Sequence, residues 1–287
     1  MPYDSSKAER EKLERLQPAK ESEKMNVTEY LELYGALAWP TNQTRPDGAF
    51  ILSFLGSFCQ SPGKEHFRRL LGVLGYYVRT CELGITYGGK SSLPPGFDEL
   101  PSDFDSTLRM HTYADSSWGK EVKPYAGYVV MVNGGASDWK AGKLGVVADS
   151  TAEAEASIVS KGAKATVAMR NVAAHVGRPA SGPSALATDS QALCDIVSKP
   201  GTTSRTRYFE RTTMLVKELY VRDIVYLVGQ NDTCNDGLAE CDGECWQRDN
   251  QEDPCFRNHM DNRCPAMLEG PWRKMRGLTY QRWWLWR

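Results

Sequence analysis

Apolar residues in the first third of the chain recur at helical spacing. The apolar positions are Tyr30, Tyr34 and Leu37, then residues 50–58, then residues 67–78. Intervals of three or four residues place side chains on one face of a helix. Arg45-Pro46-Asp47 and Ser61-Pro62-Gly63 interrupt the pattern, because proline disfavours helix in the residue before it and glycine closes turns. We therefore predict two or three packed helices.

From residue 108 the pattern changes to short strands followed by longer helices. Strands are expected at residues 108–114, 125–132, 136–139, 185–188 and 224–228, and helices at 151–176, from 191, and at 207–221. Asn133-Gly134-Gly135 is a hairpin turn signal, and Ser150-Thr151-Ala152-Glu153 is a capping box that opens a helix. The order βββ-α-β-α-α-β predicts an α/β fold with a mixed five-stranded sheet and flanking helices.

These patterns divide the chain into five segments. Residues 1–25 are a charged leader with the composition of a solvated helix or a disordered segment. Residues 26–92 form the helical segment, and residues 93–107 are a linker. Residues 108–240 form the α/β domain. Residues 241–287 are rich in Cys and Trp, match no standard zinc spacing, and are expected to be unstructured.

Composition narrows the class of protein. Hydrophobic residues make up 41% and charged residues 25% of the 287, which is ordinary for globular proteins. No apolar run approaches the roughly 20 residues that span a bilayer, so we expect a soluble, intracellular protein without a membrane partner, in the cytoplasm or in the nucleus. The formal net charge of -1 means that a nucleic-acid surface would have to be a local patch.

Four acidic residues fall where the predicted architecture could gather them. Asp115 is expected just past the first strand, Asp189 just past the fourth, and Asp236 after the last. Glu155 lies one turn into the long helix. Its helix face is shared by Ile158, Gly162, Met169, Val172 and Val176. A carboxylate on a core-facing stripe is costly unless a cation or hydrogen bonds compensate it, and neighbouring aspartates would suit a divalent metal.

Each acid also has a structural interpretation. Asp115 could belong to a turn, Asp189 or Ser190 could cap the next helix, and Asp236 fits a turn beside Gly237. Glu153, as the capping-box residue, points away from the face of Glu155 and is assigned to structure.

Several ordered motifs resemble the ribonuclease H domain of copia-type retrotransposons. They are Tyr113-Ala114-Asp115-Ser116-Ser117-Trp118, Ala126-Gly127-Tyr128, Ser137-Asp138-Trp139-Lys140, Ser150-Thr151-Ala152-Glu153-Ala154-Glu155, Thr188-Asp189-Ser190-Gln191-Ala192, Ser204-Arg205-Thr206-Arg207 and Asp236-Gly237-Leu238. Residues 34–84 are similar to the family's reverse-transcriptase segment between the polymerase palm and that domain. Together the matches cover roughly residues 26 to 240.

The resemblance implies a ribonuclease H-like fold and a metal-dependent endonuclease that cuts the RNA strand of RNA–DNA hybrids. The metal ligands and catalytic residues would be Asp115, Glu155, Asp189 and Asp236, holding two Mg²⁺ ions for which Mn²⁺ can substitute. Arg205 and Arg207 are the candidates for phosphate contacts, with a solvated charge pair as the alternative. The implied partners are the hybrid and the remainder of the reverse transcriptase polyprotein.

The sequence also departs from the family. The polymerase palm is absent, so no polymerase activity is expected. Ala156 stands where an aromatic residue is usual, Tyr208-Phe209-Glu210 replaces His-Ile-Asp, and the closing helix after Glu240 is lost. The alternative function is therefore a catalytically degenerate relic that binds nucleic acid or serves only as a structural polymerase fragment.

Overall fold

A computed structural model describes residues 13, 16–20, 23–88, 110–117, 124–145, 147–148, 150–180, 182–198 and 210–229. All of them belong to the first of two compact units, Met1–Asp232. The predicted linker, most of the leader, Arg205, Arg207, Asp236 and the tail lie outside the described residues.

The helical spacing of the first segment correctly predicted its helices. They are α2 (Val27–Gln43), α3 (Ala49–Gly56) and α4 (Lys64–Arg79), with a short 3₁₀ helix, η2 (Pro46–Gly48), between the first two. Asn26 caps α2 by accepting a hydrogen bond from the backbone N–H of Thr28. Leu55, Leu70 and Val73 lie in the shared core, and burial of such side chains is the main stabilising contribution.

A buried ion pair stabilises the turn at residues 45–47, where the sequence predicted that the helix would be interrupted. Arg45 Nη2 lies 2.8 Å from Asp47 Oδ2, and its Nη1 donates a hydrogen bond to the carbonyl of Thr80. The guanidinium also lies over the ring of Tyr77, 4.4 Å from its centroid. A buried charge needs such a set of partners, so the turn between α2 and α3 is fixed to the end of α4.

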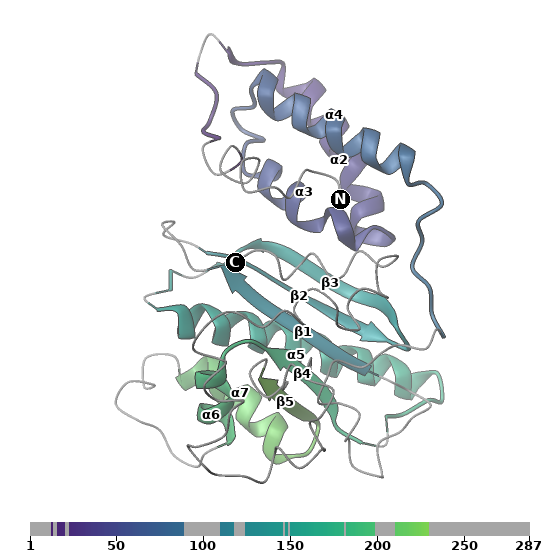
Figure 1. Ribbon diagram of the computed structural model, residues 1–287, viewed down its shortest axis with the longest axis vertical. Coiled ribbons are helices and arrows are strands. Elements are labelled where there is room, and N and C mark those ends of the chain that lie inside the picture. Colours follow the sequence, from purple (N-terminus) through teal and green to yellow (C-terminus); the bar gives the residue numbers. More distant parts are fainter. Residues whose placement is uncertain are drawn as a thin grey trace, which may run out of the picture. The chain divides into compact units, whose positions relative to one another are not determined.

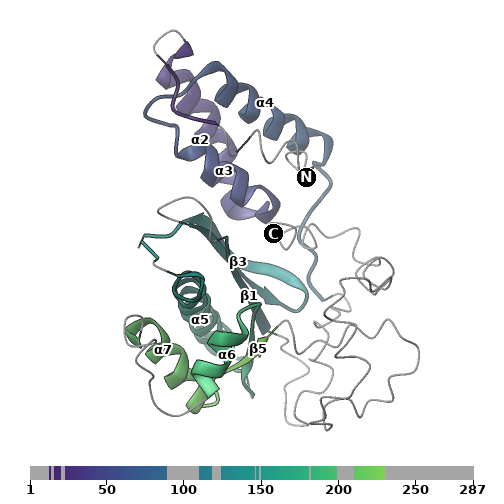
Figure 2. The ribbon, with the colours of Figure 1, turned by 60° about the vertical axis from the view of Figure 1, so that its left-hand side comes forward.

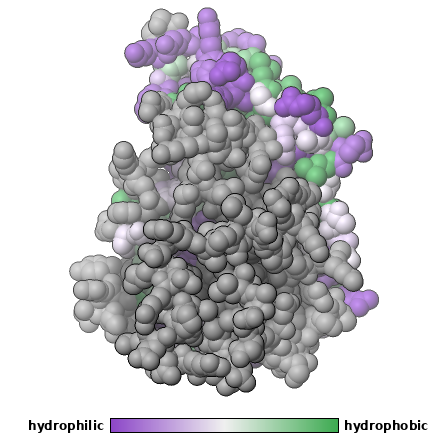
Figure 3. Space-filling model, viewed as in Figure 1, coloured by the Kyte–Doolittle hydropathy of each residue, from purple (hydrophilic) through white to green (hydrophobic). Residues whose placement is uncertain are grey.

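Apolar side chains also remain on the outer surface of this segment. Figure 3 shows both hydrophobic and hydrophilic residues on the visible face of this segment. On α4 the exposed apolar residues are Leu71, Leu74 and Val78. No helix among the described residues is long and apolar enough to cross a membrane.

The second part of the chain forms a five-stranded mixed sheet (Figure 1). Its strands are β1 (Met110–Ser117), β2 (Tyr125–Val132), β3 (Gly135–Lys143), β4 (Ser184–Thr188) and β5 (Val225–Gly229). The order is β3-β2-β1-β4-β5: the first three strands are antiparallel, and β1, β4 and β5 are parallel. Asn133 and Gly134 both have positive φ, as the predicted hairpin turn requires.

Within the described part of the chain, three helices accompany the sheet: α5 (Thr151–His175), α6 (Gln191–Ser198) and α7 (Glu210–Val221). Ser150 caps α5 as predicted, because its Oγ accepts a hydrogen bond from the Glu153 N–H at 3.2 Å. Helix α5 packs on β1, β2 and β4 and contacts α6 and α7; Figure 2 shows α5 and α7 on the same side of the sheet. The expected α/β class, a mixed five-stranded sheet with flanking helices, is confirmed.

Two local predictions were wrong. Strand β1 continues to Ser117, because its antiparallel pairing with β2 extends to Tyr125, so Asp115 lies within the strand and not past it. The apolar stripe of α5 also ends early: Val172 is 55% and Val176 70% exposed. The helical period carries Val172 about 100° around the axis from Glu155, and Val176 lies at the C-cap.

Side-chain contacts also join the sheet to the helical segment. Trp139 Nε1 on β3 donates a hydrogen bond to the carbonyl of Thr41 at 3.0 Å, and the hydroxyl of Tyr87 donates to the carbonyl of Ala136 at 2.9 Å. The rings of Phe50 and Tyr125 meet edge to face. Helices and sheet therefore share buried surface.

Candidate metal centre

Three of the four candidate acids come from elements that meet at one end of the sheet. Asp115 lies near the C-terminal end of β1, and Asp189 directly follows β4. Because β1 and β4 are parallel neighbours, their carboxyl ends lie at the same edge. Glu155 lies in the second turn of α5, which packs across both strands.

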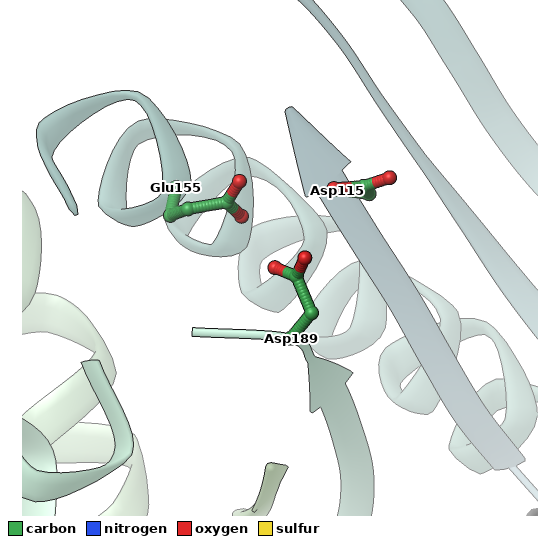
Figure 4. Close-up of side chains that lie close together, drawn as sticks. All are labelled: Asp115, Glu155 and Asp189. Carbon is green, nitrogen blue, oxygen red and sulfur yellow. The ribbon is translucent and has the colours of Figure 1, made fainter. Parts of the chain in front are cut away.

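The three carboxyl groups form one cluster, shown in Figure 4. One oxygen from each of Asp115, Glu155 and Asp189 lies within 4.8 Å of the others. Glu155 is only 1% exposed, whereas the two aspartates are half-buried. The cluster is therefore closed on its helix side and accessible on its aspartate side.

The structural alternative for Asp115 does not apply, and of the two expected caps of α6 the structure identifies Ser190. Asp115 is paired within a strand, opposite Gly127 of β2, and is not a turn residue. The cap of α6 is Ser190, whose Oγ accepts a hydrogen bond from the Leu193 N–H at 3.3 Å. Glu153, the predicted structural control, is not part of the cluster.

Ser116 holds the buried carboxylate in place. Its Oγ donates a hydrogen bond to Glu155 Oε1 at 2.7 Å, and its backbone N–H donates to the same oxygen at 3.2 Å. Successive strand side chains point to opposite faces, so Ser116 faces α5. This residue was not among the candidates from the sequence, although strand alternation next to Asp115 was the signal that could have identified it.

The surroundings of Glu155 disfavour its charge. Burial, together with the neighbouring Asp189 and Asp115 carboxylates, raises the pKa of Glu155 to about 8, despite the lowering effect of the hydrogen bonds from Ser116. Glu155 Oε2 is buried and has no hydrogen-bond partner among the described residues. A group of oxygen ligands that includes an unsatisfied buried oxygen, Glu155 Oε2, fits a hard divalent cation such as Mg²⁺.

The remaining candidates cannot be placed in this cluster. Asp236, Arg205 and Arg207 lie outside the described residues. Their assignments stay predictions.

Fold and site together define a class: a ribonuclease H-like α/β sheet with a carboxylate cluster at its strand ends. In sequence, 140 residues are 29% identical to the Retrovirus-related Pol polyprotein from transposon TNT 1-94 of Nicotiana tabacum. That match covers 48% of this chain and 10% of the relative, so the chain spans about a tenth of the length of that polyprotein. No protein-family model matches the chain.

Solved structures also resemble part of the chain. Ribonuclease H1 from Halobacterium salinarum is 18% identical, with 44% of this chain and 89% of that chain covered and a TM-score of 0.32. LC11-RNase H1 in complex with an RNA/DNA hybrid is 8% identical. The match covers 44% of this chain and 88% of that chain, with a TM-score of 0.32.

Proposed function

We propose that this chain is a divalent-metal-dependent endonuclease of a copia-type retrotransposon, which cleaves the RNA strand of RNA–DNA hybrids during reverse transcription. The observation that carries the proposal is the cluster of Asp115, Glu155 and Asp189, with one oxygen of each within 4.8 Å of the others. The sequence similarity to a retrotransposon polyprotein supports the biological setting.

The proposed roles follow from the positions of the acids. Asp115, Glu155 and Asp189 would hold one Mg²⁺ ion, and Asp115 with Asp236 a second. Bound there, the ions would supply an activated water and neutralise charge on the scissile phosphate. Ser116 orients the Glu155 carboxylate, and the half-buried aspartates present their oxygens toward the accessible side of the cluster.

Substrate recognition follows from the chemistry of the hybrid. The 2′-hydroxyls of the RNA strand can be read across a wide, shallow minor groove. Arg205 and Arg207 are proposed to contact phosphates, and the other partner is the remainder of the reverse transcriptase polyprotein. Mn²⁺ would substitute for Mg²⁺, since both accept oxygen ligands.

The test is cleavage of a labelled RNA–DNA hybrid in Mg²⁺, Mn²⁺ or chelator, with a matched pair of variants. Glu155→Gln removes the negative charge of a proposed metal ligand. It should lower the cleavage rate by more than about 100-fold, because even the loss of a residue that only hydrogen-bonds to a metal ligand typically lowers activity about 10- to 100-fold. Glu153→Gln, two residues earlier on the same helix, should leave cleavage nearly intact and cost at most about 1 kcal/mol of stability.

The reverse order of these two effects would contradict the proposed site. Absence of cleavage by a folded, metal-loaded parent protein would favour the degenerate relic instead. Asp236→Asn tests the proposed second ion, because its loss should lower turnover more than hybrid binding.

A further inference from the structure

One residue of the sheet, Tyr125, belongs to the core of the helical segment. Tyr125 is the first residue of β2, and its side chain is buried in the same apolar cluster as the inner residues of α2, α3 and α4. Its ring meets the ring of Phe50 edge to face, 5.5 Å between centroids, and lies 5.8 Å from the ring of Phe54. Both phenylalanines lie on α3. Strand β2 is therefore held by α3 at the residue where it begins.

The side chain of Tyr125 lies on the face of the sheet that carries the Asp115 side chain. Gly127 of β2 pairs with Asp115, and Tyr125 pairs with Ser117. Directly paired residues share a face, and every second residue returns to it. Tyr125 is therefore the diagonal neighbour of Asp115, at about 7–8 Å between Cα atoms. Helix α5 covers the opposite face, to which Ser116 points, so α5 and α3 hold this strand end from both sides.

The backbone connects Tyr125 to the proposed metal ligands in two steps. The next residue of β2, Ala126, pairs with Ser116, which directly follows Asp115 on β1. The hydroxyl and the backbone N–H of Ser116 both donate hydrogen bonds to Glu155 Oε1. Packed protein interiors are dense and transmit strain. A displacement at the start of β2 would therefore change the separation of the two ligands that Ser116 joins.

Another contact between the helical segment and the sheet lies far from the cluster. The hydroxyl of Tyr87 donates a hydrogen bond to the carbonyl of Ala136. Ala136 pairs with Met131, and Met131 pairs with His111, four residues before Asp115. At about 3.4 Å per residue, this contact is about 14 Å along the strand from Asp115. Tyr87 thus joins the same two parts of the chain without reaching the ligands.

We propose that Tyr125 is a positioning residue, through which the helical segment holds the carboxylate cluster in the geometry that binds a divalent cation. This inference rests on the proposed function, which assigns that cluster to the metal. Tyr125 contacts neither the cation nor the hybrid in this role; it fixes the start of β2, and with it the pairing of β2 with the end of β1. The coupling is reciprocal, so a bound cation also stabilises the packing of α3 on Tyr125.

The test measures Mg²⁺ affinity by titration calorimetry and hybrid cleavage at saturating Mg²⁺, both on the full chain. Tyr125→Ala should weaken Mg²⁺ binding about three- to tenfold, less than the loss of a group that hydrogen-bonds directly to a ligand. Its kcat should fall about tenfold or more, because small misplacements of reacting groups are costly, while KM for the hybrid changes little. The matched control, Tyr87→Ala, should keep the parent values.

Three further variants separate positioning from a general loss of stability. Tyr125→Phe keeps the ring between Phe50 and Phe54 and should restore most of the Mg²⁺ affinity. Phe50→Ala removes the edge-to-face partner on α3 and should act like Tyr125→Ala, which keeps the proposal testable if Tyr125→Ala does not fold. Its control is Phe58→Ala, because Phe58 stacks on His66 within the helical segment. Phe58→Ala should lower the melting temperature and leave Mg²⁺ affinity unchanged.

Amide hydrogen exchange in α3 gives a readout that does not depend on cleavage. In the parent protein, saturating Mg²⁺ should slow exchange in α3, because the bound cation favours the packed arrangement. In Tyr125→Ala the same addition should leave the exchange of α3 unchanged. Exchange in α3 that does not respond to Mg²⁺ in a parent that binds the ion would overturn the coupling.

Equal Mg²⁺ affinity for Tyr125→Ala and Tyr87→Ala would overturn the inference and leave the proposed function standing. A loss of affinity in Phe58→Ala as large as that in Phe50→Ala would do the same, since lower stability alone would then explain both. A parent protein that binds no Mg²⁺ would overturn both the inference and the proposed function. If the parent binds Mg²⁺ but does not cleave the hybrid, the proposed function fails, and the affinities alone decide the role of Tyr125.

Discussion

At the scale of single residues, Ser116 shows how a neutral side chain can determine a charged site. Both of its donors bind Glu155 Oε1, which leaves Oε2 as the oxygen available to a cation. Without these bonds the carboxylate would be free to rotate in its buried position. Outer-shell hydrogen bonds of this kind orient metal ligands and strengthen binding.

Ser116→Ala should therefore weaken Mg²⁺ binding about 10- to 100-fold, as measured by titration calorimetry, while the fold is retained. Ser116→Thr keeps the hydroxyl and should restore most of the affinity. Ser117→Ala is the control, because the Ser117 hydroxyl donates to the carbonyl of Tyr125 and not to the cluster. Equal affinity for Ser116→Ala and Ser117→Ala would show that Ser116 does not orient the ligand.

At the scale of elements, the position of Glu155 depends on how closely α5 approaches the sheet. A Cβ on Gly162 would lie 3.2 Å from Thr112 Cγ2 and 3.6 Å from the Ala114 Cβ. Next to this contact the hydroxyls of Thr112 and Thr166 form a buried hydrogen bond of 2.6 Å. The absent side chain at Gly162 thus lets the helix lie directly on β1.

Gly162→Val should lower the free energy of unfolding by about 1–3 kcal/mol, because the added methyl groups overpack this contact. The matched change is Gly72→Val on α4, where a Cβ would meet nothing within 4 Å; it should be neutral or slightly stabilising, since valine is the better helix former. Denaturant unfolding of the two variants measures the difference. A decrease of equal size in both would mean that helix propensity, and not close packing, decides the outcome at Gly162.

At the scale of the whole molecule, the cluster couples distant parts of the chain. Asp115, Glu155 and Asp189 come from two strands and a helix, so the complete set of ligands exists only in the folded state. A cation that binds the folded state alone stabilises it by mass action. The raised pKa of Glu155 also means that folding of the metal-free protein opposes ionisation of this residue.

Added Mg²⁺ or Mn²⁺ should accordingly raise the melting temperature, by roughly 5–10 °C at a hundredfold excess over Kd. The shift should grow as pH rises from about 5 to 8. Metal-free stability falls over that range, because the folded pKa of Glu155 is about 8 and the unfolded value is 4.5, whereas the ion binds the ionised form. Melting curves with and without chelator measure this, and a shift that is absent or independent of pH would contradict the site.

The sequence by itself determined the elements, the fold class and three candidate ligands. The proline and glycine breaks, the Ser150 cap and the Asn133-Gly134 turn act within a few residues, and each appears in the structure at its expected place. Glu155 could be identified because helical periodicity and the cap together set its register. Asp189 could be placed because the buried strand before it ends where its apolar run ends.

Only the tertiary structure decided the length of β1, the exposure of Val172 and the hydrogen bonding of Ser116. The strand length and the hydrogen bonding depend on contacts between residues apart in sequence: Ser117 with Tyr125, and Ser116 with Glu155. Local propensity carries no information about such pairs. Their register is set by the free energy of packing the whole sheet against α5, which exists only once the chain has folded.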